Sequence, residues 1–129
     1  MKYLSIVLSK LYFVYLIVLI ILFVLPTKGT VRLNPTILGI RTDLFIHSML
    51  FIPYYVLYVL YRKEKMQFKQ AIISGIVFAA FCESLHLWIP YRSFSGLDFV
   101  ANACGLTLGI LGVKLVQKIG GQFLRYLMN

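Results

Sequence analysis

The sequence predicts an all-α fold, a polytopic membrane protein whose four transmembrane helices form a bundle in a single domain, residues 1–129. Hydrophobic residues make up 60% of the chain, and the mean hydropathy is +0.87. The apolar residues run continuously in stretches close to the roughly 20 residues that a helix needs to cross a bilayer. A transmembrane β-barrel would instead alternate apolar and polar residues. We place the helices at about residues 4–25, 44–61, 70–89 and 98–117.

The net charge of +9 predicts an orientation in the membrane rather than a nucleic-acid partner, because the basic residues lie at helix ends and in loops. These residues are concentrated in the second loop and near the two ends of the chain. We therefore predict a multi-pass protein of the cell membrane with both termini in the cytoplasm. The second loop and the chain ends carry Lys2, Arg62, Lys63, Lys65, Lys69, Lys118 and Arg125, and the other two loops carry Lys28, Arg32, Arg41 and Arg92.

The first predicted helix is aliphatic and aromatic nearly all round, which indicates a peripheral helix that faces lipid. Lys10 interrupts it and no small-x-small cleavage site follows, so we expect a retained helix and not a signal peptide. Pro26 ends the helix. The loop that follows, residues 27–42, contains no recognisable motif. It is long enough to lie along the outer surface, where Leu38 and its apolar neighbours can reach the membrane interface.

The second predicted helix opens with polar residues. Thr42 can cap its amino end, and Asp43 in the first turn complements the helix dipole. His47 lies one turn further along, on the same face as Asp43. An ionisable side chain inside an apolar helix is costly unless it faces protein or water. His47 is therefore a candidate functional residue as well as a candidate packing residue, and Pro53 is expected to kink the helix.

The third predicted helix carries Glu83, the most costly residue of the chain. It lies near the carboxyl end of the helix, where the dipole disfavours a carboxylate and no cap explains it. We favour a functional role over a buried ion pair, for which Arg41, Arg92 or a histidine would be the partner. His86 shares the face of Glu83 and is expected to lie nearer water. Small residues that allow close helix contact come earlier, at Gly75, Ala79 and Ala80.

The turn before the fourth predicted helix is polar and rich in turn-forming residues. Ser95 and Asp98 fit a capping box, which gives Asp98 a structural explanation. Asn102 lies one turn further along and can form a hydrogen bond across a helix contact. Because a stripe of small residues continues from it, we expect the fourth helix to be the central one, packed on the third. The stripe consists of Gly105, Gly109 and Gly112.

The second, third and fourth helices each carry polar residues near the predicted outer end. The alternating direction of successive helices is expected to bring these residues together at one depth, just below the outer membrane surface. The candidate ligand-binding residues are Asp43, His47, Glu83, Arg92, Asp98 and Asn102. The candidate catalytic residues are Glu83, His47 and His86.

The order and spacing of these residues resemble the VanZ-like family of small bacterial membrane proteins. The matching pieces are Asp43-x-x-x-His47, then Glu83 ahead of Pro90-x-Arg92, then Ser95-x-x-Asp98-x-x-x-Asn102-x-x-Gly105-x-x-x-Gly109. They cover about residues 41–112, and the first helix fits only as a hydrophobic segment. His86 stands where the family usually has glutamine. The family is named for an accessory protein of low-level teicoplanin resistance, so the resemblance implies a role in the bacterial cell envelope but no established reaction.

Three functions remain open at this point. The first is binding, without turnover, of a lipid-linked or anionic envelope component, such as a lipid-linked glycan or a peptidoglycan precursor, with Arg92 holding a phosphate. The second is a membrane-embedded enzyme acting on an envelope lipid or glycan, in which Glu83 and a histidine perform acid–base chemistry or hold a divalent metal. The third is a structural partner in envelope assembly, whose polar cluster holds three helices together.

We predict no cofactor and no dedicated metal site. Cys82 and Cys104 are too few for a disulfide framework, and the chain has no CxxC spacing, HExxH motif or P-loop. We interpret both cysteines as small packing residues. The predicted partners are membrane lipids and, through the small-residue stripe, neighbouring helices.

Overall fold

The computed structural model describes residues 2–25, 36–62 and 68–120. Within these ranges the chain forms four helices long and apolar enough to cross a membrane, which confirms the all-α membrane class. They are α1 (Lys2–Val24), α2 (Thr42–Arg62), α3 (Phe68–Ser84) and α4 (Gly96–Gly120), with a short 3₁₀ helix, η1 (Leu85–Trp88), after α3. Several residues behind the predicted orientation lie outside the described ranges, and the orientation stays a prediction. They are Lys28, Arg32, Lys63, Lys65 and Arg125.

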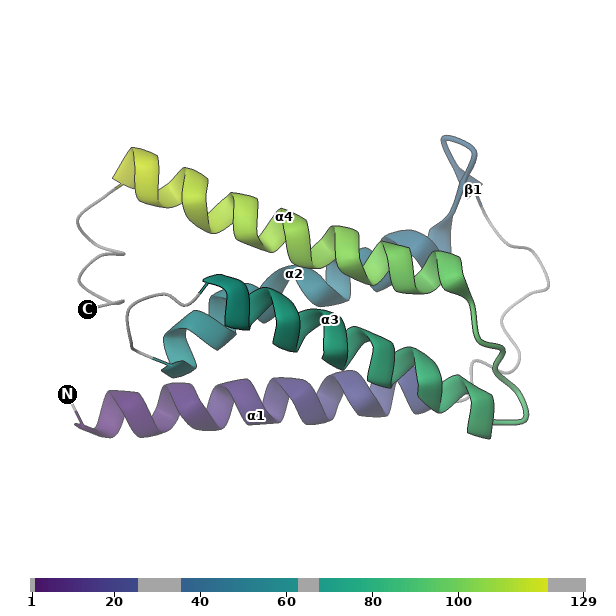
Figure 1. Ribbon diagram of the computed structural model, residues 1–129, viewed down its shortest axis with the longest axis horizontal. Coiled ribbons are helices and arrows are strands. Elements are labelled where there is room, and N and C mark those ends of the chain that lie inside the picture. Colours follow the sequence, from purple (N-terminus) through teal and green to yellow (C-terminus); the bar gives the residue numbers. More distant parts are fainter. Residues whose placement is uncertain (1, 26–35, 63–67, 121–129) are drawn as a thin grey trace.

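Successive helices run in opposite directions along the bundle (Figure 1). We call the end that holds the turn between η1 and α4, residues 89–95, the turn end. At the turn end α1 and η1 finish and α2 and α4 begin, while α1 begins and α4 finishes at the opposite end (Figure 1). The polar ends of α2, η1 and α4 therefore meet at the turn end.

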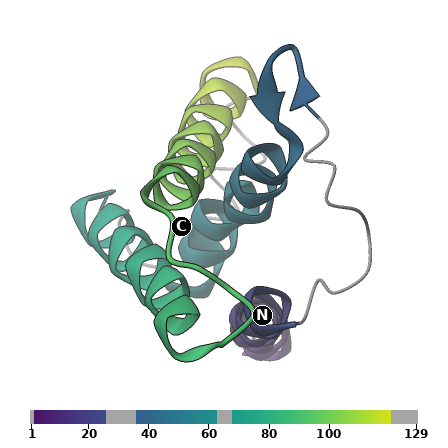
Figure 2. The same ribbon diagram turned by 90° about the vertical axis from the view of Figure 1, so that its right-hand side faces the viewer.

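The central helix is α2 and not, as the sequence suggested, the fourth. It contacts α1, α3 and α4, and its contact with α4 is the most extensive in the molecule (Figure 2). The small residues of α4 explain the arrangement, because a Cβ on Gly105 would collide with the backbone of Ser48, and one on Gly109 with the backbone of Ile52. The predicted close contact exists, but these two glycines approach α2. Helix α4 also packs on α3 as predicted, where a Cβ on Gly75 would lie 2.7 Å from Leu106 Cδ2. Gly112 faces open space and takes no part.

The predicted helix over residues 70–89 is α-helical only in its first part. The α-helical hydrogen bonding stops at Ser84, and Leu85–Trp88 continues as a 3₁₀ helix. Ile89 then has an extended backbone, with φ −107° and ψ 113°. The following proline accounts for this, because the ring of Pro90 disfavours helical backbone in the residue before it.

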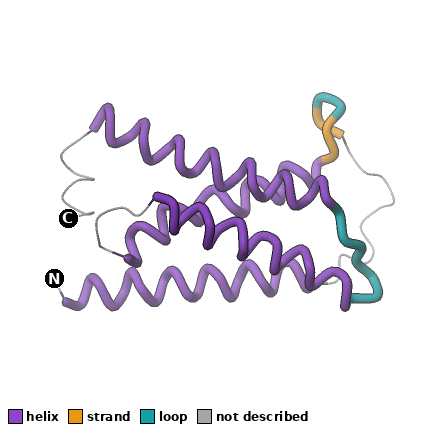
Figure 3. Tube along the Cα trace, in the orientation of Figure 1, coloured by secondary structure: helices purple, strands orange, loops and turns teal. Residues whose placement is uncertain are grey.

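A small β-hairpin precedes α2 and was not predicted. Strands β1 (Thr36–Ile37) and β2 (Ile40–Arg41), orange in Figure 3, pair antiparallel. They are joined by Leu38 and Gly39, which both have positive φ. A two-residue turn with two positive φ values fits the twist of a hairpin but usually contains Asn-Gly or Asp-Gly. The leucine at this position explains why a hairpin could not be recognised from the sequence.

Helix α1 is peripheral, as predicted, with a narrow buried stripe that packs mainly on α2. Tyr12 stacks on Tyr61 with ring centroids 4.9 Å apart and donates a hydrogen bond to the hydroxyl of Tyr54 at 3.2 Å. Nearer the middle of the bundle, the Tyr15 hydroxyl donates to the carbonyl oxygen of Leu50 at 2.6 Å. The remaining surface of α1 is largely exposed aliphatic side chains, which suits contact with lipid.

Candidate functional site

Five of the polar residues form one group at the turn end where α2 meets α4. Arg41, at the end of the hairpin, forms an ion pair with Asp43, and its Nε lies 3.1 Å from Asp43 Oδ1. The Arg41 Nη2 also lies 3.7 Å from Asp98 Oδ1, and the Asp98 Oδ2 lies 3.8 Å from Nε2 of His47. On its other side, His47 Nδ1 lies 3.2 Å from the Asn102 Oδ1. The predicted meeting of Asp43, His47, Asp98 and Asn102 therefore occurs, with Arg41 as an added member.

Arg41 supplies the positive charge of this group. The hydrogen bond to Asp43 raises the pKa of the Arg41 guanidinium above its ordinary value, so Arg41 stays charged throughout the physiological range. Two carboxylates thus share one guanidinium at the start of α2 and α4. Their charge is also favourable there because both Asp43 and Asp98 lie in the first turn of a helix.

The capping box predicted for the fourth helix is half formed. The Asp98 N–H donates to Ser95 Oγ at 3.3 Å, as that motif requires. The Asp98 carboxylate does not return to the Ser95 N–H; it turns to Arg41 and His47 instead. The Ser95 N–H donates to Glu83 Oε1 at 2.8 Å. Glu83 therefore takes the place that Asp98 was expected to fill.

This contact corrects the sequence reading of Glu83, which found no local structural reason for a carboxylate. Glu83 is fully buried, and the chain folds back so that its carboxyl group lies beside the amino end of α4, where the helix dipole favours negative charge. The Oε1 atom receives the Ser95 N–H, and it also lies 3.2 Å from His86 Nδ1. The other oxygen, Oε2, is buried and has no hydrogen-bond partner within the described residues.

His86 is buried, with only 2% of its surface exposed, whereas the sequence placed it nearer water. Its Nε2 lies 3.1 Å from the carbonyl oxygen of Phe23, which can only accept, so this nitrogen carries a proton. Its Nδ1 faces the Glu83 Oε1, and this contact needs a second proton, either on the imidazole or on the carboxyl group. His86 and Glu83 therefore form a buried pair that shares a proton.

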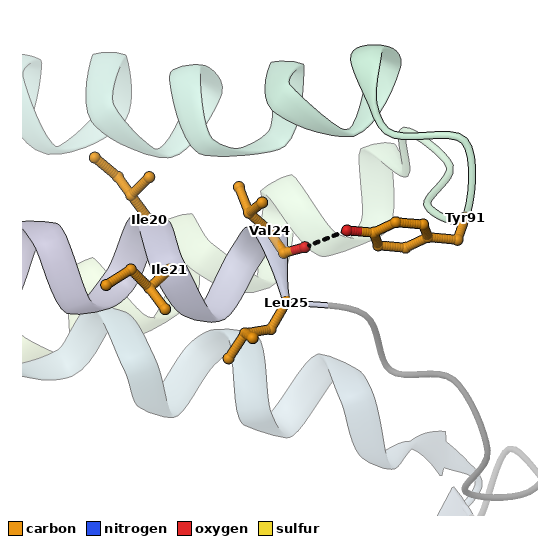
Figure 4. Close-up of a pocket in the computed structure, with 5 residues that line it drawn as sticks. All are labelled: Ile20, Ile21, Val24, Leu25 and Tyr91. Atoms are coloured by element: carbon orange, nitrogen blue, oxygen red, sulfur yellow. Dashed lines mark hydrogen bonds between the residues drawn. The ribbon is translucent and has the colours of Figure 1, made fainter.

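The last turn of α1 belongs to the site, which the sequence did not indicate. Three consecutive carbonyl groups at the end of this helix receive side-chain donors from the other side of the turn end. The His86 Nε2 donates to Phe23, the Tyr91 hydroxyl to Val24 at 2.9 Å (Figure 4), and the Arg92 Nη2 to Leu25 at 3.1 Å. Carbonyls at a helix end lack partners in their own helix and carry the negative end of its dipole. Donors from η1 and the turn, one of them a guanidinium, therefore dock this end of α1 on the bundle.

Phe23 also links the two histidines. Its ring meets His47 edge to face at 5.0 Å and stacks on His86 at 5.7 Å between centroids. An aromatic residue near the end of an apolar helix gives no sequence signal for such a role. Its position joins the α2–α4 group and the Glu83–His86 pair into one site.

Among the cavities at the turn end, two share Arg92. The first, of about 290 Å³, lies between α1 and α2, and we call it the lipid-side cavity. Its walls are mainly aliphatic and aromatic, and its polar lining consists of Asp43, His47 and Arg92. The second, of about 380 Å³, lies along η1 and the turn, and we call it the turn-side cavity. The Arg92 Nε is buried and lacks a hydrogen-bond partner in the described part of the chain. The lipid-side cavity is completed by Leu22, Phe23, Ile46 and Leu50.

A metal site requires several donor side chains gathered around one point. Within residues 2–25, 36–62 and 68–120, no group of three His, Cys, Asp or Glu side chains is arranged to hold an ion. Cys82 is buried and Cys104 is exposed, and neither forms a disulfide. The two histidines are paired with carboxylate, amide and backbone oxygens.

The fold and the site define a small polytopic membrane protein with a buried polar cluster at one end of a four-helix bundle. Comparison with protein families identifies it further: residues 11–117 match the VanZ/LLP1 family, and the chain belongs to that family. The match begins within α1, so the family unit includes the helix that docks on the site. No curated protein and no solved structure matched the chain.

Proposed function

We propose that this protein binds a phosphate-bearing, membrane-anchored component of the bacterial cell envelope at the turn end, without chemical turnover. One observation carries the proposal: an aliphatic cavity between two membrane helices ends at Arg92, a half-buried arginine whose Nε is a buried, spare donor. Arg41 is already paired with Asp43, whereas the Arg92 Nε has no partner among the described residues. A buried donor without a partner costs roughly 1–3 kcal/mol, which an incoming acceptor would recover.

The chemistry of the cavity suits a phosphate on an apolar chain. A guanidinium recognises phosphate by charge-assisted hydrogen bonds, which are stronger than the bond that Arg92 makes to a neutral carbonyl. His47 also lines the cavity, but its ring nitrogens lie next to Asn102 and Asp98, so Arg92 is the donor that meets the phosphate. The aliphatic walls accept the chain, as in most small-molecule sites, where a few polar groups fix the orientation.

An acid–base enzyme is the second candidate, because the site contains two histidines that each face a carboxylate. In the described conformation, however, both nitrogens of each imidazole lie next to protein oxygen atoms. A general base needs a nitrogen within hydrogen-bond reach of substrate. Binding is therefore the better-supported function, and a purely structural role is the alternative that experiment must separate from it.

Native mass spectrometry of purified protein tests the proposal. We expect a phosphate-bearing lipid to co-purify with the wild type and to be lost, at least tenfold, from Arg92→Gln. The matched control is Arg62→Gln, an exposed arginine of α2 at the opposite end of the bundle. Equal lipid on Arg92→Gln and wild type would refute the proposed site, and a folded protein without any bound lipid would favour the structural role.

The envelope role is tested in cells. We expect deletion of the gene to change susceptibility to teicoplanin, and complementation with the wild type, but not with Arg92→Gln, to reverse the change. An unaltered minimum inhibitory concentration of teicoplanin in the deletion strain would show that this protein does not affect teicoplanin susceptibility. Lipid binding is tested independently by mass spectrometry.

We also propose that the turn end faces outward and that both termini are cytoplasmic, in line with the distribution of basic residues. In a background with Cys82→Ala and Cys104→Ala, a cysteine at Ser93 is expected to react with an impermeant thiol reagent in intact cells. A cysteine at Lys69, at the opposite end of the bundle, is expected to react only after lysis. The reverse labelling would place the site on the cytoplasmic face.

A further inference from the structure

We infer that the ligand reaches its site sideways from the bilayer, through a portal between α1 and α2, and that it is an amphiphile whose chain stays in this portal. The inference rests on the proposed function, because it concerns the same phosphate site at Arg92. It adds the direction of access, the helix that must move and the chemical class of the ligand.

The lipid-side cavity is graded from apolar to polar. At its rim, Leu22 of α1 is 40% exposed and Ile46 of α2 is 55% exposed, on surfaces of helices that span the membrane. At its floor, Phe23 is 3% exposed and His47 is 8% exposed. A ligand that fits this gradient carries a polar group at its leading end and an apolar chain behind it. A free inorganic anion would make no favourable contact with the aliphatic rim.

Two contacts between α1 and the rest of the protein bound the portal. On the side toward the middle of the bundle, Tyr15 donates to the carbonyl of Leu50, which itself lines the cavity. On the side of the turn, Arg92 donates to the carbonyl of Leu25. Leu22 and Phe23 lie between these two contacts, which are separated by at most about three turns of α1. Separating the last turns of α1 from α2 widens the cavity without breaking the α2–α4 contact.

Arg92 lies between the lipid-side and turn-side cavities and lines both. When a phosphate reaches it, the guanidinium exchanges the Leu25 carbonyl for an anionic oxygen, which loosens the end of α1 as the ligand is gained. Any group attached beyond the phosphate would extend into the turn-side cavity, beside Ser93 and the exposed ring of Trp88. The ligand class is therefore a phosphate amphiphile, with its chain toward the bilayer and a further polar group permitted toward the turn.

A reversible cross-link across the portal tests this inference. Leu22→Cys and Ile46→Cys are combined in a protein without its native cysteines, placed in nanodiscs of zwitterionic lipid and joined with a short, reducible bis-thiol reagent. The probe is radiolabelled dodecyl phosphate. We expect cross-linking to lower the amount bound at least tenfold and reduction to restore it. The control pair is Phe13→Cys and Tyr61→Cys, at the opposite end of the α1–α2 contact, where the native rings are 5.3 Å apart; its cross-link is expected to leave binding unchanged.

The outcomes separate the inference from the function on which it rests. No binding of dodecyl phosphate to the protein before cross-linking would refute the proposed function. Binding that survives the Leu22–Ile46 cross-link would support the binding site but refute entry through the portal. Binding of radiolabelled inorganic phosphate with equal affinity would refute the inference that the ligand is an amphiphile. Ile46→Trp, which narrows the portal without any reagent, should weaken binding in the same direction, and full binding by this variant would likewise count against the portal.

Discussion

The contact of α2 with α4 and the contact of α1 with the bundle are built in different ways. The first is backbone against backbone: Gly105 and Gly109 let α4 approach the carbonyls of Ser48 and Ile52 so closely that a methyl group would collide with them. The second is made by side chains, with tyrosine rings and hydroxyls along α1 and three side-chain donors on the carbonyls of its last turn. Close backbone packing tolerates little movement, whereas side chains can exchange partners.

This difference separates a fixed part of the protein from one that can move. The α2–α4 pair holds Asp43, His47, Asp98 and Asn102 at set positions. Helix α1 closes the site from one side and is docked at its end by Tyr91, a histidine and an arginine. Because ligand-binding elements are drawn from the less stable parts of a structure, α1 is the element expected to respond to a ligand. The predictions that follow test this contrast, beginning with the largest effect.

Gly105→Leu should have the largest effect, because the new side chain would collide with the backbone of α2. Overpacking of this kind typically costs about 1–3 kcal/mol, and the rigid partner places this case at the upper end. We expect a marked loss of folded protein in the membrane. Gly112→Leu is the matched control, since the same change on the same helix meets open space. Equal accumulation and melting of the two variants in detergent would show that α2 and α4 are not in close contact.

Glu83→Ala should have the next largest effect, because it leaves the Ser95 N–H and the His86 Nδ1 without their partner. The expected loss is about 1–3 kcal/mol of unfolding free energy. Glu83→Gln should recover only part of it, since the amide oxygen can accept hydrogen bonds but lacks the negative charge that is favourable at the amino end of α4. The control is Ser84→Ala, whose hydroxyl donates to the carbonyl of Phe81 within its own helix. Chemical denaturation in detergent measures the difference, and wild-type stability of Glu83→Ala would remove the cap that we assign to this residue.

The sequence was a good guide to the class and extent of the helices because continuous apolar runs of bilayer length have few other solutions. It was a weaker guide to their packing. Gly105 and Gly109 correctly predicted a close helix contact, but small residues do not specify which neighbour approaches: both glycines meet α2, while α4 packs on α3 through other residues. The hairpin before α2 was missed because Leu38 stands where a two-residue turn usually has asparagine or aspartate.

The polar side chains of the candidate site were predicted from the sequence, but its contacts with backbone atoms were not. Asp43, His47, Asp98 and Asn102 came together because helix direction and spacing fix their depth. The carbonyls at the end of α1 carry no side-chain signal, so neither the burial of His86 nor the docking of α1 could be inferred. The cap that Glu83 provides was hidden for the same reason, because its partner is a backbone N–H.

Tyr91→Phe should have the smallest effect and the most local one. The change removes the hydroxyl that donates to the carbonyl of Val24, a hydrogen bond near the surface, and leaves the ring in place. The expected loss is about 0.5–1.5 kcal/mol, which corresponds to roughly a twofold to tenfold faster local opening. Hydrogen exchange should therefore accelerate in the last turns of α1, while the amides around Gly105 keep their protection. Ser93→Ala, in the same turn, is the control and should change neither. If exchange rises equally in α1 and α4, then α1 does not open independently of the α2–α4 pair. The proposed difference between a movable α1 and a fixed α2–α4 contact would then be wrong.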